Sequence, residues 1–329
     1  MPLGPVAWAT FKATLGAAGR RPGELLGLTA SEMAREFELT DDEAERIATL
    51  LSRAGPLAIA LERLASLGIW ISTLLDETYP PKLRDRLGDK APPLLFGSGD
   101  LVAARQGGLA IIGSRDVDES AQEFAASIAR AAANGGLPVI SGAARGIDSV
   151  AMVGALEYGG TVVGVLAESL AKRIREPLVR SWLADGVLCL LTPYAPESGF
   201  SVGAAMGRNK LIYALSDAAL VVSTAEGTGG TWAGATEALK ARWTPVMVRQ
   251  GDGAPAANQR LIERGALPFP QIAFETLTNS DLQAIVAGDG DTDKRSEPII
   301  GGTVQDSLFG EIEPTGKPVK RKGRSRKSP

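Results

Sequence analysis

Four loops carry the residues in this chain that are best suited to chemistry, and they lie at 113–115, 141–148, 208–210 and 227–231. Glycines in such loops let backbone N–H groups approach an anion, and hydroxyl side chains add further donors. Arginine contributes a forked donor that matches the oxygens of a phosphate. The combination predicts a site for a phosphate-bearing ligand. The loop at 227–231 contributes Thr228, Gly229, Gly230 and Thr231 to it.

Composition excludes several classes of enzyme. The chain has no histidine, so it cannot contain a Ser-His-Asp or Cys-His system, an imidazole base or a histidine-bound metal. Its single cysteine, Cys189, lies in the apolar run 187–191 and is expected to be buried. The GxGxxG fingerprint and the GxxxxGK[ST] loop are both missing, which argues against a nicotinamide cofactor or ATP hydrolysis. We expect no metal, no cofactor and no catalytic group.

Hydropathy and charge bear on the environment of the protein. No run approaches the 18 or so apolar residues needed to cross a bilayer, and Pro2, Gly4 and Pro5 interrupt the start of the chain. A soluble cytoplasmic protein is expected. The net charge is −3, but seven basic residues and no acidic residue lie in 316–329. This basic end suits a phosphate-bearing partner, and it equally suits a merely solubilising extension.

Short apolar runs alternate with amphipathic stretches from residue 108 onward. Strands are predicted at 109–112, 138–140, 161–166, 186–192, 218–223 and 245–248, and helices at 119–134, 148–158, 170–184, 205–215, 231–242 and 256–264. This alternation is typical of an α/β fold, a Rossmann-like, doubly wound and mostly parallel sheet. In such a sheet the carboxyl ends of the strands share one edge, so the four loops are expected to converge there.

The two ends of the chain differ from the middle. Residues 1–90 read as short helices, with capping boxes at Thr29 to Glu32 and Thr40 to Glu43. Pro56 is expected to end the helix that follows the second box, and another helix is expected at 57–67. We therefore predict a small helical module and an entry segment to the sheet at 1–90, the sheet domain at 91–285, and a disordered tail at 286–329 that is too poor in apolar residues to fold.

Several strings resemble the DNA-processing protein A (DprA, or Smf) family. They are Ile-Ile-Gly-Ser-Arg at 111–115, Ser-Gly-Ala-Ala-Arg-Gly-Ile-Asp at 141–148, Gly-Ala-Leu-Glu-Tyr-Gly-Gly-Thr at 154–161, Arg-Asn-Lys-Leu-Ile at 208–212 and Leu-Ser-Asp-Ala-Ala-Leu-Val-Val at 215–222. Tyr-Pro-Pro-Lys-Leu at 79–83 and Pro-Pro-Leu-Leu-Phe at 92–96 are similar to the segment that precedes the sheet in that family. The resemblance covers roughly residues 65–250, and the string at 141–148 is its most specific part.

The resemblance implies a non-catalytic protein that binds single-stranded DNA, forms a homodimer and helps to load a RecA-type recombinase during DNA uptake or repair. The helical module is then expected to be SAM-like or helix-hairpin-helix-like. The positions that match the family's DNA pocket are Gly113, Ser114, Arg115, Ser141, Gly142, Arg145, Gly146, Arg208, Asn209 and Lys210. Asp148 is expected to cap the following helix or to orient Arg145, because a carboxylate repels phosphate.

The sequence departs from the family at several positions. Met152 replaces a histidine, Lys210 replaces an arginine, a Tyr-Pro pair is missing from 167–175, and no winged-helix domain is evident at the C-terminal end. Thr228 to Gly234 also replaces the family's usual loop. The altered loop, with Glu237 after it, resembles that of lonely-guy-type nucleotide phosphoribohydrolases, although their glutamate follows the threonine by three residues and Glu237 follows Thr231 by six. Nucleotide binding or hydrolysis is therefore the alternative function.

A short motif lies near the C-terminal end. Gln305, Leu308 and Phe309 fit the Gln-x-[Ser/Asp]-Leu-Phe pattern with which bacterial DNA-metabolism proteins dock on the sliding clamp. An apolar pair in a polar stretch can enter a pocket on a partner. The alternative is that Leu308 and Phe309 fold back onto the sheet of their own chain.

Overall fold

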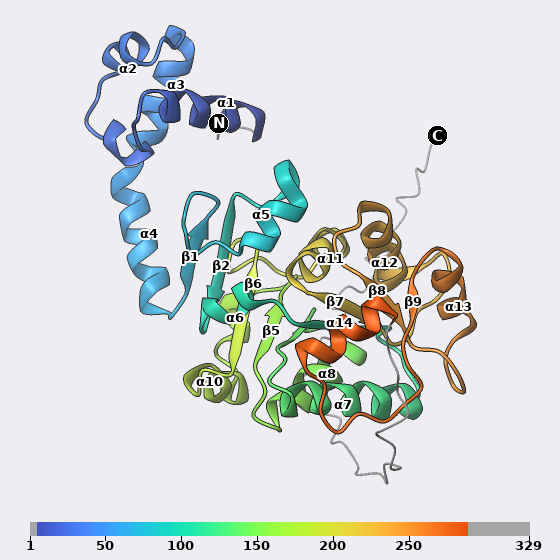
Figure 1. Cartoon of the computed structure of the whole chain (residues 1–329). Helices are drawn as coiled ribbons and strands as arrows, with labels where there is room; N and C mark the ends of the chain where they lie inside the picture. The colour runs from blue at the N-terminus through green and yellow to red at the C-terminus, as the bar shows by residue number, and fades with distance from the viewer. Residues whose placement is uncertain (1–4, 289–329) are drawn as a thin grey trace, which may run out of the picture.

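The apolar runs form one sheet, which crosses the molecule in Figure 1. The computed structural model describes residues 5–288, and side chains from residue 10 onward. The parallel strands are β3 (Leu109–Ile112), β4 (Val139–Ser141), β5 (Val162–Val165), β6 (Leu188–Thr192), β7 (Ala218–Val221), β8 (Val246–Val248) and β9 (Leu267–Pro268). The six predicted strands are confirmed, and β9 is added at the edge.

Two further strands, β1 (Trp70–Thr73) and β2 (Leu94–Ser98), extend the sheet at its other edge and pair antiparallel. The full order is β1-β2-β6-β5-β4-β3-β7-β8-β9. The expectation of helices alone over residues 1–90 is therefore wrong at β1. A four-residue strand is too short to show a period, and β1 is held by its pairing and by the Trp70 indole, whose Nε1 donates to the Gly99 carbonyl at 2.8 Å.

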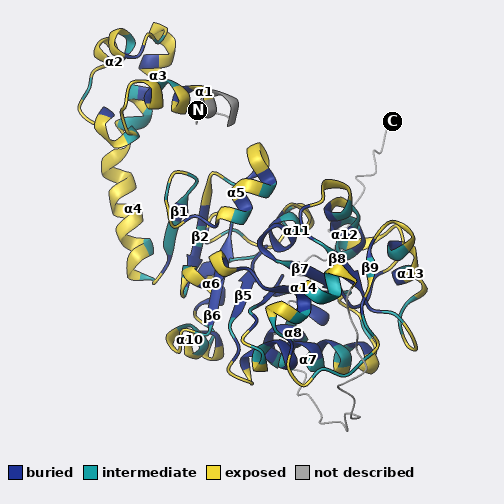
Figure 2. Cartoon of the chain, viewed as in Figure 1, coloured by how far each residue is buried: buried dark blue, intermediate teal, exposed yellow. Residues whose placement is uncertain are grey.

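Helices cover both faces of the sheet. One face carries α7 (Glu119–Asn134), α8 (Ile147–Leu156), α9 (Leu170–Arg173), α10 (Pro177–Ala184) and α14 (Asn279–Ala287). The other carries α5 (Pro81–Leu87), α6 (Leu101–Gln106), α11 (Val202–Leu215), α12 (Gly229–Ala241) and α13 (Ala256–Glu263). Leu109 and Ile111 of β3 enter the first core, whereas Ala110 and Ile112 enter the second. Every residue of β3 to β8 is buried, as the dark strands of Figure 2 show.

Two predicted helices have different limits. The helix expected at 170–184 is divided into α9 and α10, because Pro177 cannot donate a helical hydrogen bond and instead occupies the first turn of α10. The helix expected at 205–215 begins earlier, at Val202. Ser201 caps it, since its Oγ accepts a hydrogen bond from the Ala204 N–H at 3.0 Å. Arg208 therefore lies in the middle of α11 and not at its start.

The N-terminal helices are α1 (Pro5–Ala17), the 3₁₀ turn η1 (Pro22–Leu25), α2 (Ala30–Glu36), α3 (Asp41–Leu51) and α4 (Ala54–Ser66). Both predicted capping boxes are confirmed at the starts of α2 and α3. The first three helices and η1 enclose a small core of their own, and α4 runs from it to β1 with no buried residue (Figures 1 and 2). Pro56 does not end a helix: it lies in the first turn of α4, where no backbone donor is needed.

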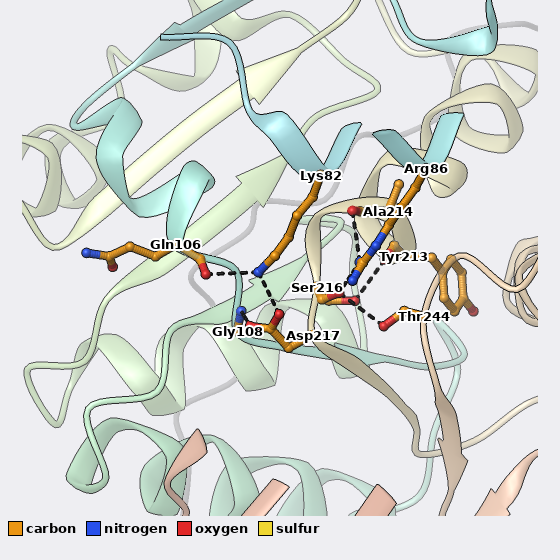
Figure 3. A network of polar contacts seen from close by, with 9 residues as sticks. All are labelled: Lys82, Arg86, Gln106, Gly108, Tyr213, Ala214, Ser216, Asp217 and Thr244. Carbon is orange, nitrogen blue, oxygen red and sulfur yellow. Dashed lines mark hydrogen bonds and ion pairs between the residues drawn. The ribbon is translucent and has the colours of Figure 1, made fainter. Parts of the chain in front are cut away.

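A polar network fastens α5 to the sheet (Figure 3). Lys82 Nζ donates to Asp217 Oδ1 at 2.5 Å and to the Gln106 carbonyl at 2.9 Å, while Asp217 Oδ2 accepts from the Gly108 N–H at 2.9 Å. Arg86 Nη1 donates to the carbonyls of Ala214 and Ser216. Because Gly108 and Asp217 immediately precede β3 and β7, the network closes the amino ends of these two strands.

Loss of the Asp217 carboxylate should destabilise this junction. Asp217→Ala removes two hydrogen bonds, one of them to a half-buried ammonium, so we expect the free energy of unfolding to fall by about 1–3 kcal/mol. Urea unfolding measures the change. Asp89→Ala removes an exposed carboxylate in the 3₁₀ turn η2 (Gly88–Lys90) and serves as the control, with an expected change below about 0.5 kcal/mol. Equal changes in the two variants would contradict the assigned role of the network.

No helix within residues 5–288 has the length and apolarity to span a membrane. The motif residues Gln305, Leu308 and Phe309, and the basic end at 316–329, lie outside the described part of the chain.

Candidate functional site

A pocket lies where the winding of the sheet reverses. From β3 the chain adds β4, β5 and β6 on one side, and it then returns to add β7, β8 and β9 on the other. The loops that leave β3 and β7 therefore diverge at the carboxyl ends of these strands, which is where doubly wound sheets bind ligands. The pocket between them has a volume of about 510 Å³, which is within the usual range for small-ligand sites.

The structure brings together many of the predicted binding residues. Gly113, Ser114, Arg115, Arg208, Asn209, Thr228, Gly229, Gly230 and Thr231 all line the pocket. Two side-chain hydrogen bonds connect the segments that line the pocket: Thr231 Oγ1, in the first turn of α12, donates to the Gly113 carbonyl at 2.9 Å, and Asn209 Nδ2, on α11, donates to the Gly230 carbonyl at 3.0 Å. Thr231 and Asn209 thus also fix the shape of the pocket.

The other predicted residues lie outside the pocket lining. Ser141 is buried and its Oγ donates to the Ile111 carbonyl at 2.7 Å, which joins β4 to β3. Lys210 Nζ donates to the Lys90 carbonyl at 3.0 Å and so joins α11 to η2. Arg145 is 64% exposed and pairs with Asp116 at 3.0 Å near the rim.

Gly142 and Gly146 let the neighbouring chain segments pack closely. Gly146 has a φ of +83°, and a Cβ there would lie 2.4 Å from the Ser114 carbonyl oxygen. A Cβ at Gly142 would lie 2.0 Å from Arg208 Nη1 and 2.4 Å from Asp148 Oδ2. No other residue type fits at these two positions without displacing the pocket.

One wall of the pocket suits an anion. The helix α12 begins here, and the side chain of its N-cap residue, Thr228, caps none of the first backbone N–H groups. Such a helix start carries unpaired donors and a favourable dipole. The Arg115 guanidinium adds a positive charge and lies 5.2 Å from the centre of the Phe200 ring.

The same pocket has an apolar rim, which sequence reasoning missed. Phe200, Val202 and Met206 line the pocket and are 47%, 72% and 40% exposed. The sequence contains one signal for it: Phe200 and Val202 lie just before the helix predicted at 205–215 and Met206 lies in its first turn, and none of the three belongs to a predicted strand. Exposed apolar side chains around a pocket are typical of a surface that a ligand covers.

Asp148 has a different role from the one expected. It does not cap α8, whose N-cap is Gly146, and Arg145 is oriented by Asp116 instead. The carboxylate is buried and lines the pocket, close enough to Arg208 for a strong electrostatic interaction. Burial raises its pKa to about 6, although Arg208 and the N–H groups of the adjacent loops oppose the shift. Burial also lowers the pKa of Arg208.

The raised pKa makes a testable contribution to stability. The folded protein binds a proton at Asp148 below about pH 6, whereas the unfolded chain binds it only below its ordinary value near 3.8, so this contribution is lost as pH rises through 6. Between pH 4.5 and pH 7.5, the free energy of unfolding of Asp148→Asn should rise by about 1–3 kcal/mol relative to that of the parent, since asparagine stays neutral. Urea unfolding at both pH values measures the gain, and with no histidine in the chain no imidazole obscures it. If the free energies of unfolding of the two proteins differ by the same amount at both pH values, the argument that burial raises the pKa of Asp148 is contradicted.

Arg173 supports the loop that follows β4. Its Nη2 donates to the Ala143 carbonyl at 3.2 Å, and it pairs with Glu168 and Glu176 at 2.9 and 3.0 Å. Ala143 has a φ of +52°, a left-handed conformation that an alanine rarely adopts. Arg173 lies in the 167–175 stretch where the Tyr-Pro pair is missing, and the sequence pattern gave no sign of its buried ion pairs.

The glutamate on which the alternative function depends lies elsewhere. Glu237 is exposed on α12 and does not line the pocket. Among the described residues, no cluster of acidic and cysteine side chains could hold a metal ion. The sheet and its pocket thus define a Rossmann-like protein with a pocket at the topological switch point.

Comparison with known proteins specifies the family. The model of the family named DNA recombination-mediator protein A matches residues 70–277, and the chain belongs to that family. The protein Smf of Escherichia coli K12 is 31% identical over 159 residues, which cover 46% of this chain and 41% of Smf. The DNA processing protein DprA of Streptococcus pneumoniae R6 is 32% identical over 98 residues, covering 30% and 34%. The matched stretches span less than half of either relative.

Two solved structures share the fold. The X-ray structure of DprA from Streptococcus pneumoniae has a TM-score of 0.58 and 19% identity, and the match covers 86% of this chain and 98% of that one. A DprA structure from Helicobacter pylori, described as giving insight into a single-stranded DNA binding mode, has a TM-score of 0.50 and 24% identity, covering 66% and 94%. The predicted fold class and family are confirmed.

Proposed function

We propose that this protein binds single-stranded DNA in the pocket at the carboxyl ends of β3 and β7, and that it acts in DNA processing and recombination without catalysing a reaction. One observation carries the proposal: groups suited to phosphate and exposed apolar side chains line the same pocket. A single strand presents this pair of surfaces, because its phosphates and the faces of its bases are both accessible.

The family relationship supports the same ligand. The Helicobacter pylori relative is described by its single-stranded DNA binding mode, and the Streptococcus pneumoniae relative by DNA processing. We further propose that the protein forms a homodimer and delivers DNA to a RecA-type recombinase in the cytoplasm. Docking on a sliding clamp through Gln305, Leu308 and Phe309 also stays a proposal.

Titration of labelled oligo(dT) at two salt concentrations tests the proposal. If the protein contacts about three phosphates, the affinity should fall roughly 40-fold between 50 and 300 mM NaCl, because binding releases counterions from the strand at about 0.7 per contact. A blunt duplex of the same length is the control and should bind more weakly. Failure to bind oligo(dT) even at low salt would overturn the proposal.

The alternative of nucleotide hydrolysis has a separate test. Incubation with nucleoside monophosphates should release no free base, because Glu237 is exposed on α12 and outside the pocket. Release of base that is abolished by Glu237→Ala would favour the hydrolase instead.

A further inference from the structure

The helix α4 carries apolar side chains that the described part of the chain leaves exposed. Leu57, Ile59 and Leu61 are 57%, 71% and 43% exposed, and no residue of α4 is buried (Figure 2). Leu57, Leu61 and Leu64 recur at intervals of four and three residues, so they form one apolar stripe along the helix, and Leu64 packs on the sheet core where α4 reaches it. A helix this apolar normally has a packing partner, because water solvates such a surface poorly.

The segment that precedes α4 is strongly acidic. Residues 36–45, the acidic segment, contain six acidic residues and no basic residue, and all six acidic residues are exposed. A groove of about 500 Å³ runs along α3 from Asp42 to Arg53, which precedes α4. Its charged lining residues are Asp42, Glu45, Arg46 and Arg53. The groove therefore leads from the acidic segment to the start of the helix that carries the apolar stripe.

The C-terminal part of the same chain offers the complementary groups in the matching order. An apolar portion at 299–312 comes first, and the basic end at 316–329, with seven basic residues and no acidic one, follows it. We propose that residues 299–312 pack on the apolar stripe of α4 and that the basic end lies against the acidic segment. The apolar residues available for this contact are Ile299, Ile300, Val304, Leu308, Phe309 and Ile312.

The chain is long enough to make this contact. It leaves the described part of the structure at Gly288, after α14, which lies beside α7 on the same face of the sheet as Leu64. Because α7 packs on β3 and α4 leads into β1, the path crosses five strand spacings, or about 24 Å. Sixteen residues separate Gly288 from Val304, and a chain of that length spans about 22 Å as a random coil and about 55 Å when fully extended.

The charge pattern favours this occupant over a second copy of the protein. A second α4 could cover the apolar stripe, but it would bring no basic segment to balance residues 36–45, whereas the C-terminal part of the chain supplies both the apolar and the basic groups. Docking on α4 also covers Leu308 and Phe309. A partner that binds the motif at 305–309 must then displace it from α4, so the contact regulates access to that motif.

Disulfide trapping tests the contact in the full-length protein. The one native cysteine, Cys189, is buried, so introduced cysteines react without interference. Leu61→Cys is combined with Phe309→Cys, and the control combines Phe309→Cys with Leu178→Cys, because Leu178 is another exposed apolar residue, 47% exposed on α10. With oxidised glutathione at low protein concentration, the pair that includes position 61 should form a disulfide at least tenfold faster, within one chain, as mass spectrometry of the digested protein shows.

Hydrogen exchange measures the cover over α4 without any crosslink. Leu308→Asp combined with Phe309→Asp removes the apolar contact, so the amides of α4 should exchange at least tenfold faster than in the parent. Thr303→Asp combined with Thr315→Asp is the control, because it adds the same charge at polar positions of the same segment. Its exchange at α4 should stay within threefold of the parent.

Charge reversal tests the second half of the contact. Asp42→Lys combined with Glu45→Lys should slow the disulfide between positions 61 and 309 about threefold, since exposed charge pairs contribute modestly. Adding Lys320→Glu and Lys322→Glu to the same protein should restore the rate. Glu43 is left unchanged, because it belongs to the capping box of α3.

The outcomes decide between the possible occupants. Disulfides that form equally fast at positions 61 and 178, or only between two chains, overturn the proposal. Protection of α4 that survives Leu308→Asp with Phe309→Asp and rises with protein concentration assigns the apolar stripe to a second copy, and it overturns the proposal as well. Fast trapping within one chain, together with loss of protection in that variant, supports it.

Discussion

Replacing Arg115 with alanine is expected to weaken binding of oligo(dT) by about 1–3 kcal/mol, which is roughly fivefold to 150-fold, while the fold stays intact. Arg115 lines the wall of the pocket that suits an anion, and within residues 5–288 no carboxylate forms an ion pair with it, so its charge is available to a phosphate. Its guanidinium also lies over the Phe200 ring at 5.2 Å, which orders it in the free protein. Anisotropy titration gives the affinity, and a thermal melt confirms folding.

Arg145→Ala is the matched control, because it removes the same charge from a neighbouring loop. Arg145 is 64% exposed and already pairs with Asp116, and it does not line the pocket. A threefold loss or less is expected, since exposed ion pairs and distant charges contribute little in solvent. Equal losses in the two variants would show that the protein attracts DNA through its general field and not through this pocket.

A single methyl group at Gly142 is expected to disrupt both folding and binding. The added Cβ would lie 2.0 Å from Arg208 Nη1 and 2.4 Å from Asp148 Oδ2, and both side chains are buried. Overpacking of this kind costs about 1–3 kcal/mol of stability. We expect Gly142→Ala to lose that amount in urea unfolding and to bind oligo(dT) at least tenfold more weakly.

Gly203→Ala controls for the loss of a glycine. Gly203 lies in the first turn of α11, and nothing comes within 4 Å of a Cβ built there. Alanine favours the helix, so stability should stay the same or rise by up to about 1 kcal/mol. A loss of stability at Gly203 equal to that at Gly142 would contradict the packing argument.

The sheet could be predicted from sequence because its strands are buried on both faces. Runs such as Leu109–Ile112 and residues 188–191 are continuously apolar, and amphipathic helices separate them. The antiparallel strand Trp70–Thr73 carries no such signal, as it is short and half-buried at the edge of the sheet. The division of the helix expected at 170–184 follows from Pro177, which occupies the first turn of α10.

The pocket was predictable in part. Glycines and hydroxyls beside Arg115 and Arg208 indicated an anion site, because strand ends in a parallel sheet must converge. The sequence could not show that Arg145 points outward, that Lys210 is held by a backbone carbonyl, or that Asp148 is buried. Those outcomes depend on how the loops pack against each other. The spacing of residues along the chain does not determine this packing.

Photo-crosslinking tests the central claim most directly, namely that DNA occupies the pocket at the carboxyl ends of β3 and β7. Oligo(dT) containing 4-thiothymidine is bound to the full chain, irradiated and digested, and the crosslinked peptides are identified by mass spectrometry. We predict crosslinks in the peptides that contain Phe200 and Met206, and their loss in Arg115→Ala at the same DNA concentration. Crosslinks confined to the basic residues at 316–329, with none at the pocket, would contradict the account.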